Sequence, residues 1–495
     1  MTAAQLEVAL RSRLLEAAPL LLPGCVPAEL GSLSTIELVR IVLRSLRERD
    51  RASAWLGYVA LAGAFPTLPQ LDDFARALRL ASDATLVAEV LEAVDIAERR
   101  HRTADRTIRI VRDSIIVDVG FCATHAHNTG IQRVVRSLIP RWEQSGHPHL
   151  LVAWTHDDAG YRDLTEVERR RVTDWRQDSP RPIGTEATPD ELIVPWECGL
   201  FLPEVPQYDQ CGPLAALADA AVATIDLIGY DVIPITSADS VSAGESERFA
   251  IFLDVVKRAR SVIAISDTVR GEFDGFASTL SSQGIAGPAV HSVPLAVDVP
   301  PGAREIAASE TGTRVPTVLC VGSHEPRKNQ EAVLFAAQRL HREGVPIRMV
   351  FVGGGNRVAY ADFDRRVRAL RRTGMQVESH RRLSDAELWR LYGESRFSVF
   401  VSLHEGFGLP VAESLALGTP TLTSDRGSLA EIAALGGCVT VDPRDDEAIV
   451  NGMRALLSDD ELRDRLAGEA ARIASRSWLD YAERVWELVA ARGVA

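Results

Sequence analysis

The stretch that decides the fold is His404-Glu405-Gly406-Phe407-Gly408-Leu409-Pro410-Val411-Ala412-Glu413-Ser414. It follows the apolar run Phe397–Val401 and places Glu405 and Glu413 eight positions apart across a glycine-rich turn. A buried strand, a flexible acidic turn and a helix in this order are typical of the ligand-binding edge of an open α/β sheet. The glycines let backbone N–H groups approach a ligand closely, and the start of the helix attracts phosphate. Glu413, one to two turns into that helix, would accept hydrogen bonds from a sugar diol.

Length and composition limit the class of protein. A chain of 495 residues is too long for one ordinary core and indicates two or three domains. Its 46% hydrophobic and 25% charged content are those of a soluble globular protein. The sequence has no apolar stretch of the roughly 18 residues that span a bilayer and no signal-peptide pattern, so we expect a cytoplasmic protein.

Net charge and cysteine usage argue against a nucleic-acid partner, a zinc site and a disulfide framework. The formal charge of −13 argues against a nucleic-acid partner, because phosphate backbones bind basic surfaces. The six cysteines are scattered without a Cys-x-x-Cys pair. This pattern indicates reduced, mostly buried side chains rather than a zinc site or a disulfide framework.

Residues 1–105 are expected to form an all-helical accessory domain. Ser34 to Glu37 is a capping box followed by apolar residues at helical spacing, and residues 86–96 repeat an amphipathic pattern. Pro66 and Pro69 mark a break between helices. The charges of this region are balanced, which leaves three alternatives open: peripheral contact with the inner face of a membrane, a partner protein, or a second copy of the chain.

Strands and helices alternate from about residue 110 onward. This alternation predicts parallel sheets with helices on both faces, in one domain over residues 110–300 and another over residues 314–476. Residues 298–315 are rich in Pro, Gly, Ala and Thr and are expected to link the two. Two such sheets leave a cleft between their carboxyl edges, where a nucleotide-bearing ligand would bind. The expected strands are 114–119, 150–154, 191–195, 221–225, 261–265 and 291–295 in the first domain, and 315–321, 347–352, 375–377, 397–401, 420–423 and 438–441 in the second.

Two further segments suit phosphate binding. After the first strand of the second domain come Gly322 and then Arg327 and Lys328, directly before a helical segment. Arg can fork across phosphate oxygens, and Lys supplies a compact charge. Cations at a helix N-terminus oppose its dipole, so an anion between them is favoured over a solvated helix start. Gly130 opens a helix after the first strand of the first domain, where its amide can approach a phosphate; a simple turn is the alternative.

The opening stretch continues into Gly418-Thr419-Pro420-Thr421-Leu422-Thr423-Ser424-Asp425. With this continuation it resembles the retaining glycosyltransferases of family 4 (group 1 glycosyltransferases), whose signature is two glutamates separated by seven residues around Gly-Phe-Gly-Leu-Pro. The stretch from Gly322 to Asn329 resembles the family's Gly-x-x-x-x-Arg-Lys-Asn segment. The resemblance covers about residues 112–490 and implies a GT-B fold, in which two Rossmann-like, doubly wound domains face each other across a cleft. It also implies that a final helix, over residues 477–495, crosses back onto the first domain.

The resemblance implies a nucleotide diphosphate sugar as donor, a saccharide or lipid-linked acceptor, and transfer with retention at the anomeric carbon. Arg327 and Lys328 would bind the donor diphosphate, Glu405 the sugar hydroxyls and Glu413 the ribose diol. The loop at Gly130 would face the diphosphate and the acceptor. We assign to the donor site, in addition, Gly322, His380, Gly406, Phe407, Gly408 and Leu409.

Three further segments are similar to segments of the family, but their residues could instead be structural, as turns, helix caps or exposed side chains. Residues 229–235 resemble the segment in which a His-Asp or Tyr-Asp pair faces the donor sugar. The histidine is absent here, and Asp231 is either the residue nearest the reacting carbon or a structural Asp-turn. His380 is either a contact to the base or an exposed side chain. Ser266 and Asp267 are favoured as helix caps.

The implied chemistry is electrostatic. Arg327, Lys328 and the amides near Gly130 and Gly408 would stabilise negative charge on the leaving diphosphate. No second carboxylate is placed as a covalent nucleophile, so the resemblance implies a front-face displacement rather than the two-carboxylate scheme of retaining glycosidases. Two cations that face the diphosphate make a divalent metal unnecessary, and we expect neither a metal site nor a cofactor.

We therefore predict a retaining hexosyltransferase. Family analogy alone suggests a hexose or deoxyhexose of the mannose, glucose or rhamnose type and a role in bacterial surface polysaccharide or glycan assembly. A nucleotide-sugar epimerase or a sugar phosphorylase of the same fold is an alternative. A non-catalytic scaffold that binds nucleotide sugar is another, although the intact acidic and basic motifs speak against it.

Overall fold

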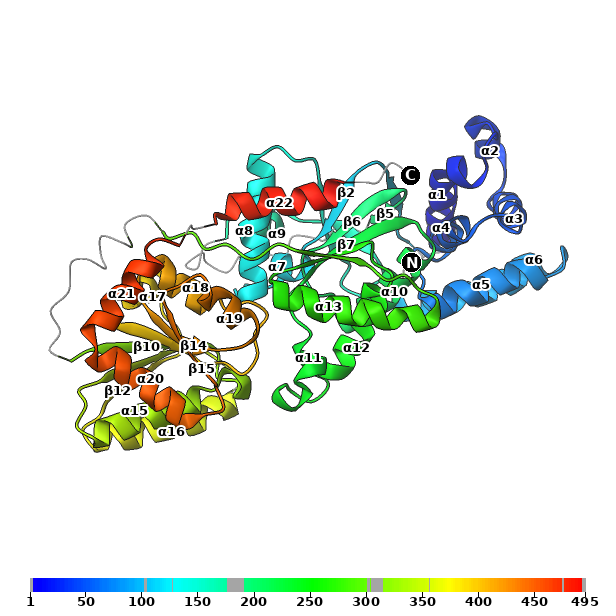
Figure 1. Cartoon of the computed structure of the whole chain (residues 1–495). Coiled ribbons are helices and arrows are strands. Elements are labelled where there is room, and N and C mark those ends of the chain that lie inside the picture. Colours follow the sequence, from blue (N-terminus) through cyan, green and yellow to red (C-terminus); the bar gives the residue numbers. More distant parts are fainter. Residues whose placement is uncertain are drawn as a thin grey trace.

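The computed structural model describes residues 3–101, 105–126, 128–175, 191–300, 303, 315–355, 357–473 and 476–491. Along the molecule lie, in order, a group of N-terminal helices, a first sheet domain and a second sheet domain (Figure 1). Most of the predicted linker, residues 301–302 and 304–314, lies outside the described residues.

The N-terminal region is helical, as predicted. Its helices are α1 (Ala3–Leu21), α2 (Pro27–Ser32), α3 (Thr35–Leu46), α4 (Arg51–Ala62), α5 (Leu68–Leu80) and α6 (Leu86–His101). The predicted capping box starts α3: Glu37 N donates to Ser34 Oγ at 3.4 Å, and Ser34 N donates to Glu37 Oε2 at 2.9 Å. Helix α4 is the centre of the group, since its residues 53–62 are all buried.

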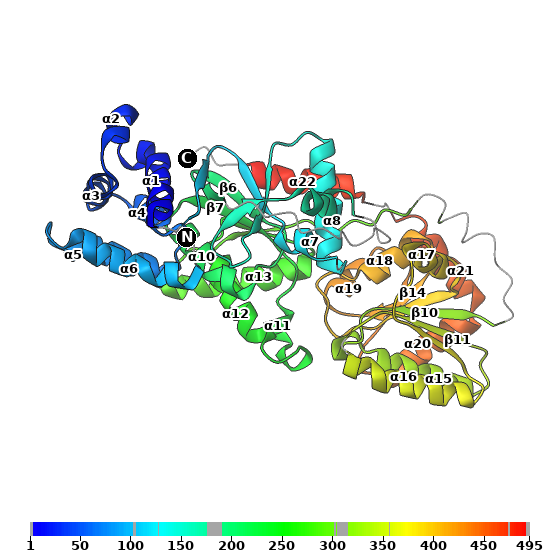
Figure 2. The same cartoon turned by 180° about the vertical axis from the view of Figure 1, so that it is seen from behind.

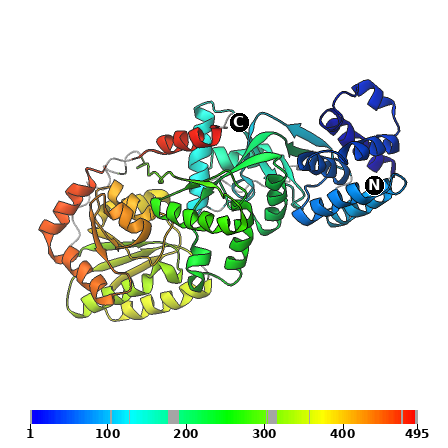
Figure 3. The ribbon, with the colours of Figure 1, turned by 45° about the vertical axis from the view of Figure 1, so that its right-hand side comes forward.

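These helices share a hydrophobic core with the first sheet domain. Phe65, after α4, packs edge-on against Trp154 and Tyr161 of the sheet, with ring centroids 6.1 and 5.8 Å away. Buried Arg13 of α1 donates to backbone carbonyls of α4 and of Arg106, where the chain enters the sheet. The helices therefore extend the first domain, on the side away from the second domain (Figure 3).

The first sheet has nine strands in the order β1-β5-β4-β3-β2-β6-β7-β8-β9. They are β1 (Ile108–Val111), β2 (Ile115–Asp118), β3 (Leu150–Trp154), β4 (Tyr161–Asp163), β5 (Leu192–Pro195), β6 (Cys198–Leu202), β7 (Ala223–Gly229), β8 (Ser261–Ala264) and β9 (Ala289–Ser292). The associated helices are α7 (Gly120–Thr124), α8 (Gly130–Gln144), α9 (Glu166–Thr173), α10 (Tyr208–Asp219), α11 (Ile233–Thr236), α12 (Glu245–Val256) and α13 (Asp267–Leu280), with short 3₁₀ turns η1 (Ala238–Ser240) and η2 (Ser281–Gln283). Helix α8 lies on one face of the sheet and α10 and α13 on the other (Figure 2).

Three strands of this sheet were missing from the prediction. β6 follows β5 after only two residues, and Glu197 turns the chain there in the left-handed conformation, with φ 48°. β4 is only three residues long and runs antiparallel to β3 and β5, in a sheet predicted to be parallel. β1 is an edge strand of four residues in which only Ile108 is buried, and Arg109 interrupts its apolar residues.

The second sheet contains all six predicted strands, in the parallel order β12-β11-β10-β13-β14-β15. They are β10 (Thr317–Val321), β11 (Arg348–Val352), β12 (Gln376–His380), β13 (Phe397–Phe400), β14 (Thr421–Ser424) and β15 (Cys438–Val441). The helices are α15 (Gln330–Arg342), α16 (Arg357–Arg372), α17 (Asp385–Glu394), α18 (Leu409–Ala416), α19 (Gly427–Ala433), α20 (Asp446–Ser458) and α21 (Asp460–Ala470), with the 3₁₀ turn η3 (Pro326–Lys328).

The strand order of the second sheet creates the site. β10 lies between β11 and β13, so the order reverses at β10, and the loops after β10 and β13 leave the same edge side by side. Leu403 N donates to Arg327 O at 2.7 Å across these loops. Lys328 and Glu405 therefore meet although they are 77 positions apart in the chain.

Helix α22 (Trp478–Ala490) returns from the second domain and lies beside α8 (Figure 1). Trp142 Nε1 donates to Ala482 O at 2.9 Å, and Arg260 Nη2 donates to Leu488 O and Val489 O. No helix in the described part of the chain is long and apolar enough to cross a membrane. The six cysteines are free and mostly buried, as predicted.

Candidate active site

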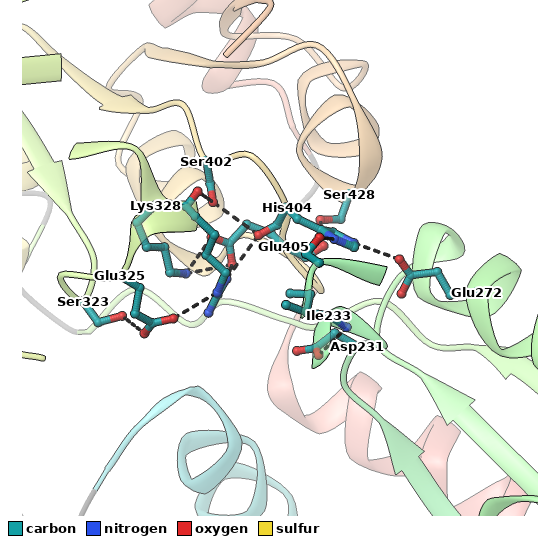
Figure 4. A network of polar contacts seen from close by, with 12 residues as sticks. Asp231, Ile233, Glu272, Ser323, Glu325, Lys328, Ser402, His404, Glu405 and Ser428 are labelled. Atoms are coloured by element: carbon teal, nitrogen blue, oxygen red, sulfur yellow. Dashed lines mark hydrogen bonds and ion pairs between the residues drawn. The ribbon is translucent and has the colours of Figure 1, made fainter. Parts of the chain in front are cut away.

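Glu405 is held between two cations at the carboxyl edge of the second sheet (Figure 4). It lies in the turn between β13 and α18, residues 402–408, which we call the Glu405 turn, and it is 8% exposed. Lys328 Nζ lies 2.6 and 2.8 Å from its carboxylate oxygens, and Arg327 Nη1 lies 3.0 Å from one of them. Both cations belong to η3, which ends at Asn329 in the left-handed conformation, with φ 54°.

The cations decide the protonation state of Glu405. Burial disfavours the charged carboxylate, but attraction to Lys328 and Arg327 outweighs burial and holds the pKa of Glu405 below its usual value. Arg327 Nε also pairs with Glu325 at 3.0 Å. Glu405 is therefore anionic at neutral pH. A carboxylate between two cations can accept hydrogen bonds from sugar hydroxyls while the cations face a phosphate.

Glu413 lies in α18 and is 2% exposed. One of its oxygens lies 2.6 Å from Arg133 Nη2, on α8 of the first domain. The other accepts a hydrogen bond from Tyr392 OH at 3.0 Å, on α17. Burial raises the pKa of Tyr392 well above its usual value, so this hydroxyl keeps its proton and donates it. Both carboxylate oxygens are therefore satisfied by groups from two other helices.

The loop after β7 brings Asp231 of the first domain near the Glu405 turn (Figure 4). Tyr230, which precedes Asp231, lies against Gly406 of that turn. A Cβ at Gly406 would lie 2.0 Å from Tyr230 O, so only glycine permits this approach. Asp231 Oδ1 accepts a hydrogen bond from Ile233 N at 3.1 Å, which is a structural Asp-turn. Burial raises the pKa of Asp231, and the charge of Arg327 opposes that rise. Asp231 thus forms its own turn and also faces the Glu405 turn.

The start of α13 docks on the second domain. Ser266 Oγ accepts a hydrogen bond from Val269 N at 3.1 Å, so it caps the helix as favoured from sequence, and it donates to Gly406 O at 2.7 Å. Glu431 of α19 accepts from the first two backbone amides of α13. A carboxylate is favourable at that end of a helix, because it faces the positive end of the dipole. The carboxyl edges of the two sheets are held together by these contacts.

The glycines and apolar residues assigned to the donor site have distinct environments. Gly408 caps α18 with φ 114°, and a Cβ there would lie 2.5 Å from a leucine methyl of α19. At Gly130, the first residue of α8, a Cβ would meet nothing within 4 Å. Gly322 O accepts a hydrogen bond from the side chain of the first residue of α15 at 2.8 Å. Phe407 and Leu409 are partly buried against the core of the first domain.

His380 stands apart from this cluster. It ends β12, two strands from β10, and its Nε2 lies 3.1 Å from Glu378 Oε2. Its side chain is 38% exposed. Its contact with a base stays a prediction.

Three side chains of the site were missed in the sequence. Arg133 follows Gly130 within the first turn of α8, and the argument used for Arg327, that a cation at a helix start needs an anion, could have found it. Tyr392 on α17 and Glu272 on α13 carried no such signal, because each meets a partner that is distant in the chain: Tyr392 bonds Glu413, and Glu272 lies 2.8 Å from His404 Nε2.

A protein-family model matches the second domain. Residues 303–473 match the family model for the glycosyl transferases group 1. This range contains the two buried carboxylates, Glu405 and Glu413, and the two cations that bind Glu405, Arg327 and Lys328.

Two curated proteins of Escherichia coli are similar to this chain. The serotype-specific mannosyltransferase WbdA of Escherichia coli is 27% identical over 338 residues, which are 64% of this chain and 38% of that protein. The O-antigen chain mannosyltransferase B of Escherichia coli is 33% identical over 148 residues, which are 30% of this chain and 38% of that protein. The chain thus spans about two fifths of the length of these relatives.

Solved structures match most of the chain. HepE of Anabaena, in complex with UDP and glucose, aligns with 76% of this chain and 99% of its own, with a TM-score of 0.54 and 12% identity. The catalytic domain of starch synthase IV from Arabidopsis thaliana, bound to ADP and acarbose, aligns with 77% of this chain and 99% of its own, with a TM-score of 0.53 and 14% identity. At such identities the likeness shows the fold alone, and that fold is the predicted GT-B arrangement.

Proposed function

Starting from a chain whose residues 303–473 belong to the group 1 glycosyltransferases, we propose that this protein transfers a hexosyl group from a nucleotide diphosphate sugar to a saccharide or lipid-linked acceptor. The observation that carries the proposal is the Glu405 carboxylate between Arg327 and Lys328. One carboxylate can hold sugar hydroxyls while two cations hold phosphate oxygens. This set suits a ligand in which a sugar and a diphosphate are adjacent.

The same set suits cleavage of the sugar–phosphate bond. Negative charge grows on the leaving diphosphate, and Arg327 and Lys328 would stabilise it, together with the N-terminus of α8, whose Arg133 contacts Glu413 of the second domain. Anionic Glu405 favours positive charge that develops on the sugar ring. Asp231 is engaged in its own turn, and we propose a front-face displacement with retention rather than a covalent glycosyl-enzyme.

Glu413 is the proposed ribose site. A diol can donate two hydrogen bonds to one carboxylate, and Glu413 is a buried carboxylate on the helix that follows the Glu405 turn. Arg133 now binds one of its oxygens, so donor binding would exchange Arg133 for ribose hydroxyls.

Mannose is the first sugar to test. Both Escherichia coli relatives described above are mannosyltransferases, and one is named for the O-antigen chain. We therefore propose a mannosyl donor and a role in the assembly of a bacterial surface polysaccharide.

The test is a panel of GDP-mannose, UDP-glucose and dTDP-rhamnose. The correct donor should raise the melting temperature of the protein and be hydrolysed slowly without acceptor, because it binds the folded state. Binding without hydrolysis or transfer would indicate a scaffold. Release of sugar phosphate that depends on added inorganic phosphate would indicate a phosphorylase, and an epimerised nucleotide sugar would indicate an epimerase. If no member of the panel is bound or cleaved, the proposed donor class is wrong.

A further inference from the structure

The carboxylate of Glu272 bonds one group of each sheet domain. Its Oε1 lies 2.8 Å from His404 Nε2, in the Glu405 turn of the second domain (Figure 4). Its Oε2 accepts a hydrogen bond from Val232 N at 3.2 Å, in the loop after β7 of the first domain. The side chains of His404 and Glu272 are only 19% and 16% exposed. The contact is therefore shielded from solvent and links two loops that belong to different sheets.

Each partner of Glu272 is joined by one peptide bond to a residue of the proposed reaction site. Val232 follows Asp231, and His404 precedes Glu405. The carbonyl of His404 also accepts a hydrogen bond from Arg327 Nη1 at 3.1 Å. A shift of Glu272 would thus move both carboxylates relative to each other and loosen the guanidinium between them.

The remaining groups around His404 support the same contact. Ser237 Oγ lies 2.9 Å from its Nδ1, so the ring is held from both sides by the first domain. Three negative groups act on the His404 ring: Glu272 on α13, Asp231 after β7 and Glu405 in the same turn. Arg327 of η3 donates a hydrogen bond to the backbone carbonyl of His404. The hydrogen bond with Glu272 raises the pKa of His404 most, burial opposes the rise, and the negative charges add to it.

We propose that Glu272 is a positioning residue: it holds the loop of Asp231 and the Glu405 turn at a fixed separation, and it thereby sets the rate of transfer without contacting the donor. The inference rests on the proposed function for its kinetic consequence, but its geometry can be tested without a donor. Two of the groups proposed to hold the donor, Lys328 and Glu413, do not contact Glu272, so we expect loss of Glu272 to lower the rate of transfer far more than the donor affinity.

The kinetic test compares Glu272→Ala with Asp274→Ala. Asp274 lies on the same helix, and its side chain is 48% exposed and pairs with Arg270 within α13. We expect Glu272→Ala to lower kcat by about a hundredfold, the size of effect that follows loss of catalytic geometry. The Kd of the donor should change far less than kcat, and Asp274→Ala should match the parent protein. A parent-like kcat in Glu272→Ala, or a loss confined to donor Kd, overturns the proposal.

Glu272→Gln separates positioning from general destabilisation. The glutamine oxygen can accept from Val232 N, and its amide can donate to Nε2 of neutral His404 but not of protonated His404. The rate of this variant should therefore rise with pH through the pKa of His404, toward the parent rate. The parent should lack this rise, because a carboxylate accepts from both forms of the ring. A pH profile parallel to that of the parent contradicts the proposal.

A donor-free measurement keeps the inference independent of the proposed function. In ¹³C-histidine NMR of the whole chain, with the His404 signal assigned by loss in His404→Gln, the pKa of His404 should lie above the usual histidine value and fall in Glu272→Gln. An unchanged titration in Glu272→Gln overturns the Glu272–His404 contact. If the titration shifts as expected but no nucleotide sugar binds, the contact stands and the proposed function fails.

Discussion

Arg133 and Glu413 are 280 positions apart in the chain, and they form an ion pair of 2.6 Å across the interface of the two sheet domains. Glu413 is almost fully buried, whereas the side chain of Arg133 is 38% exposed. The pair occupies the carboxylate that we assign to the ribose of the donor. In the absence of a donor, Arg133 therefore stabilises both the buried charge and the contact between the domains.

Arg133→Met should destabilise the free protein but strengthen its response to the donor. Removal of Arg133 leaves the Glu413 carboxylate with Tyr392 as its partner. The free energy of unfolding should fall by roughly 2 kcal/mol, which is less than for a fully buried pair because Arg133 is partly exposed. A bound ribose would then replace the missing partner. We expect a lower melting temperature without donor and a larger thermal shift with it. Arg141→Met is the control: Arg141 lies on α8 like Arg133 but pairs with Asp298, so its loss should leave the donor-induced shift unchanged.

Arg327→Ala and Lys328→Ala should each remove most transfer activity. Loss of one preorganised charge at the leaving group typically costs about 10²–10³ in kcat. Each variant also leaves Glu405 with one cation fewer, so the melting temperature should be measured in parallel. Arg339→Ala, an exposed residue of α15 that pairs with Glu343, serves as the control. A near-parental rate in either cation variant would remove the phosphate clamp from the mechanism.

Gly406→Ala should slow transfer more than it weakens donor binding. The added methyl group would lie 2.0 Å from Tyr230 O, so the Glu405 turn must move away from the first domain. A displacement of this size can cost about 10²-fold in kcat. Gly271→Ala on α13, where a Cβ would meet nothing within 4 Å, should behave like the parent. Steady-state kinetics and donor titration test the pair, and equal rates in both variants would exclude a closed arrangement during the reaction.

Two buried carboxylates should make stability fall with rising pH. Burial raises the pKa of Asp118 to about 6 and that of Glu204 to about 7, against ordinary values of 3.8 and 4.5. The folded protein binds more protons in this window, so the stability that these groups contribute is full below the ordinary values and is lost as pH rises through about 6 and 7. Glu204→Gln should lower the melting temperature at acidic pH, where the paired backbone amides of α7 lose an acceptor, but should flatten its pH dependence. A slope equal to that of the parent would show that Glu204 is not the titrating group.

Transfer should persist in EDTA. Arg327 and Lys328 already supply two positive charges beside Glu405, so the proposed clamp needs no divalent ion to hold the diphosphate. We expect the same rate before and after chelation, measured with the donor found in the panel. Loss of activity in EDTA that Mg²⁺ or Mn²⁺ restores would contradict a metal-independent clamp.

The fold could be predicted from the sequence where each element carries its own signal. The six strands of the second domain were all predicted, because most of them are apolar runs and each lies between turns or helices. β12 and β14 contain few apolar residues. In the first domain, β5 and β6 follow each other so closely that their apolar residues look continuous, and β4 is too short to show a period. The apolar residues of the edge strand β1 are interrupted by Arg109, so they form no continuous run.

The sequence by itself determined the local chemistry of the site. Residues 397–416 form a strand, a glycine-rich turn that carries Glu405 and a helix that carries Glu413. The 3₁₀ turn after β10 carries Arg327 and Lys328. These arrangements depend on residues close together in the chain. Backbone propensity and the requirement for glycine are therefore sufficient to specify them.

Only the tertiary structure decided which charges meet. Strand order brings Lys328 to Glu405, and packing of the two domains brings Arg133 to Glu413 and Glu272 to His404. Such pairs depend on the relative placement of elements tens to hundreds of residues apart, and an ion pair leaves no periodic pattern in either partner. Burial of Glu405 and Glu413 then makes each pairing necessary, because an unpaired charge in the interior is far more costly than one at the surface.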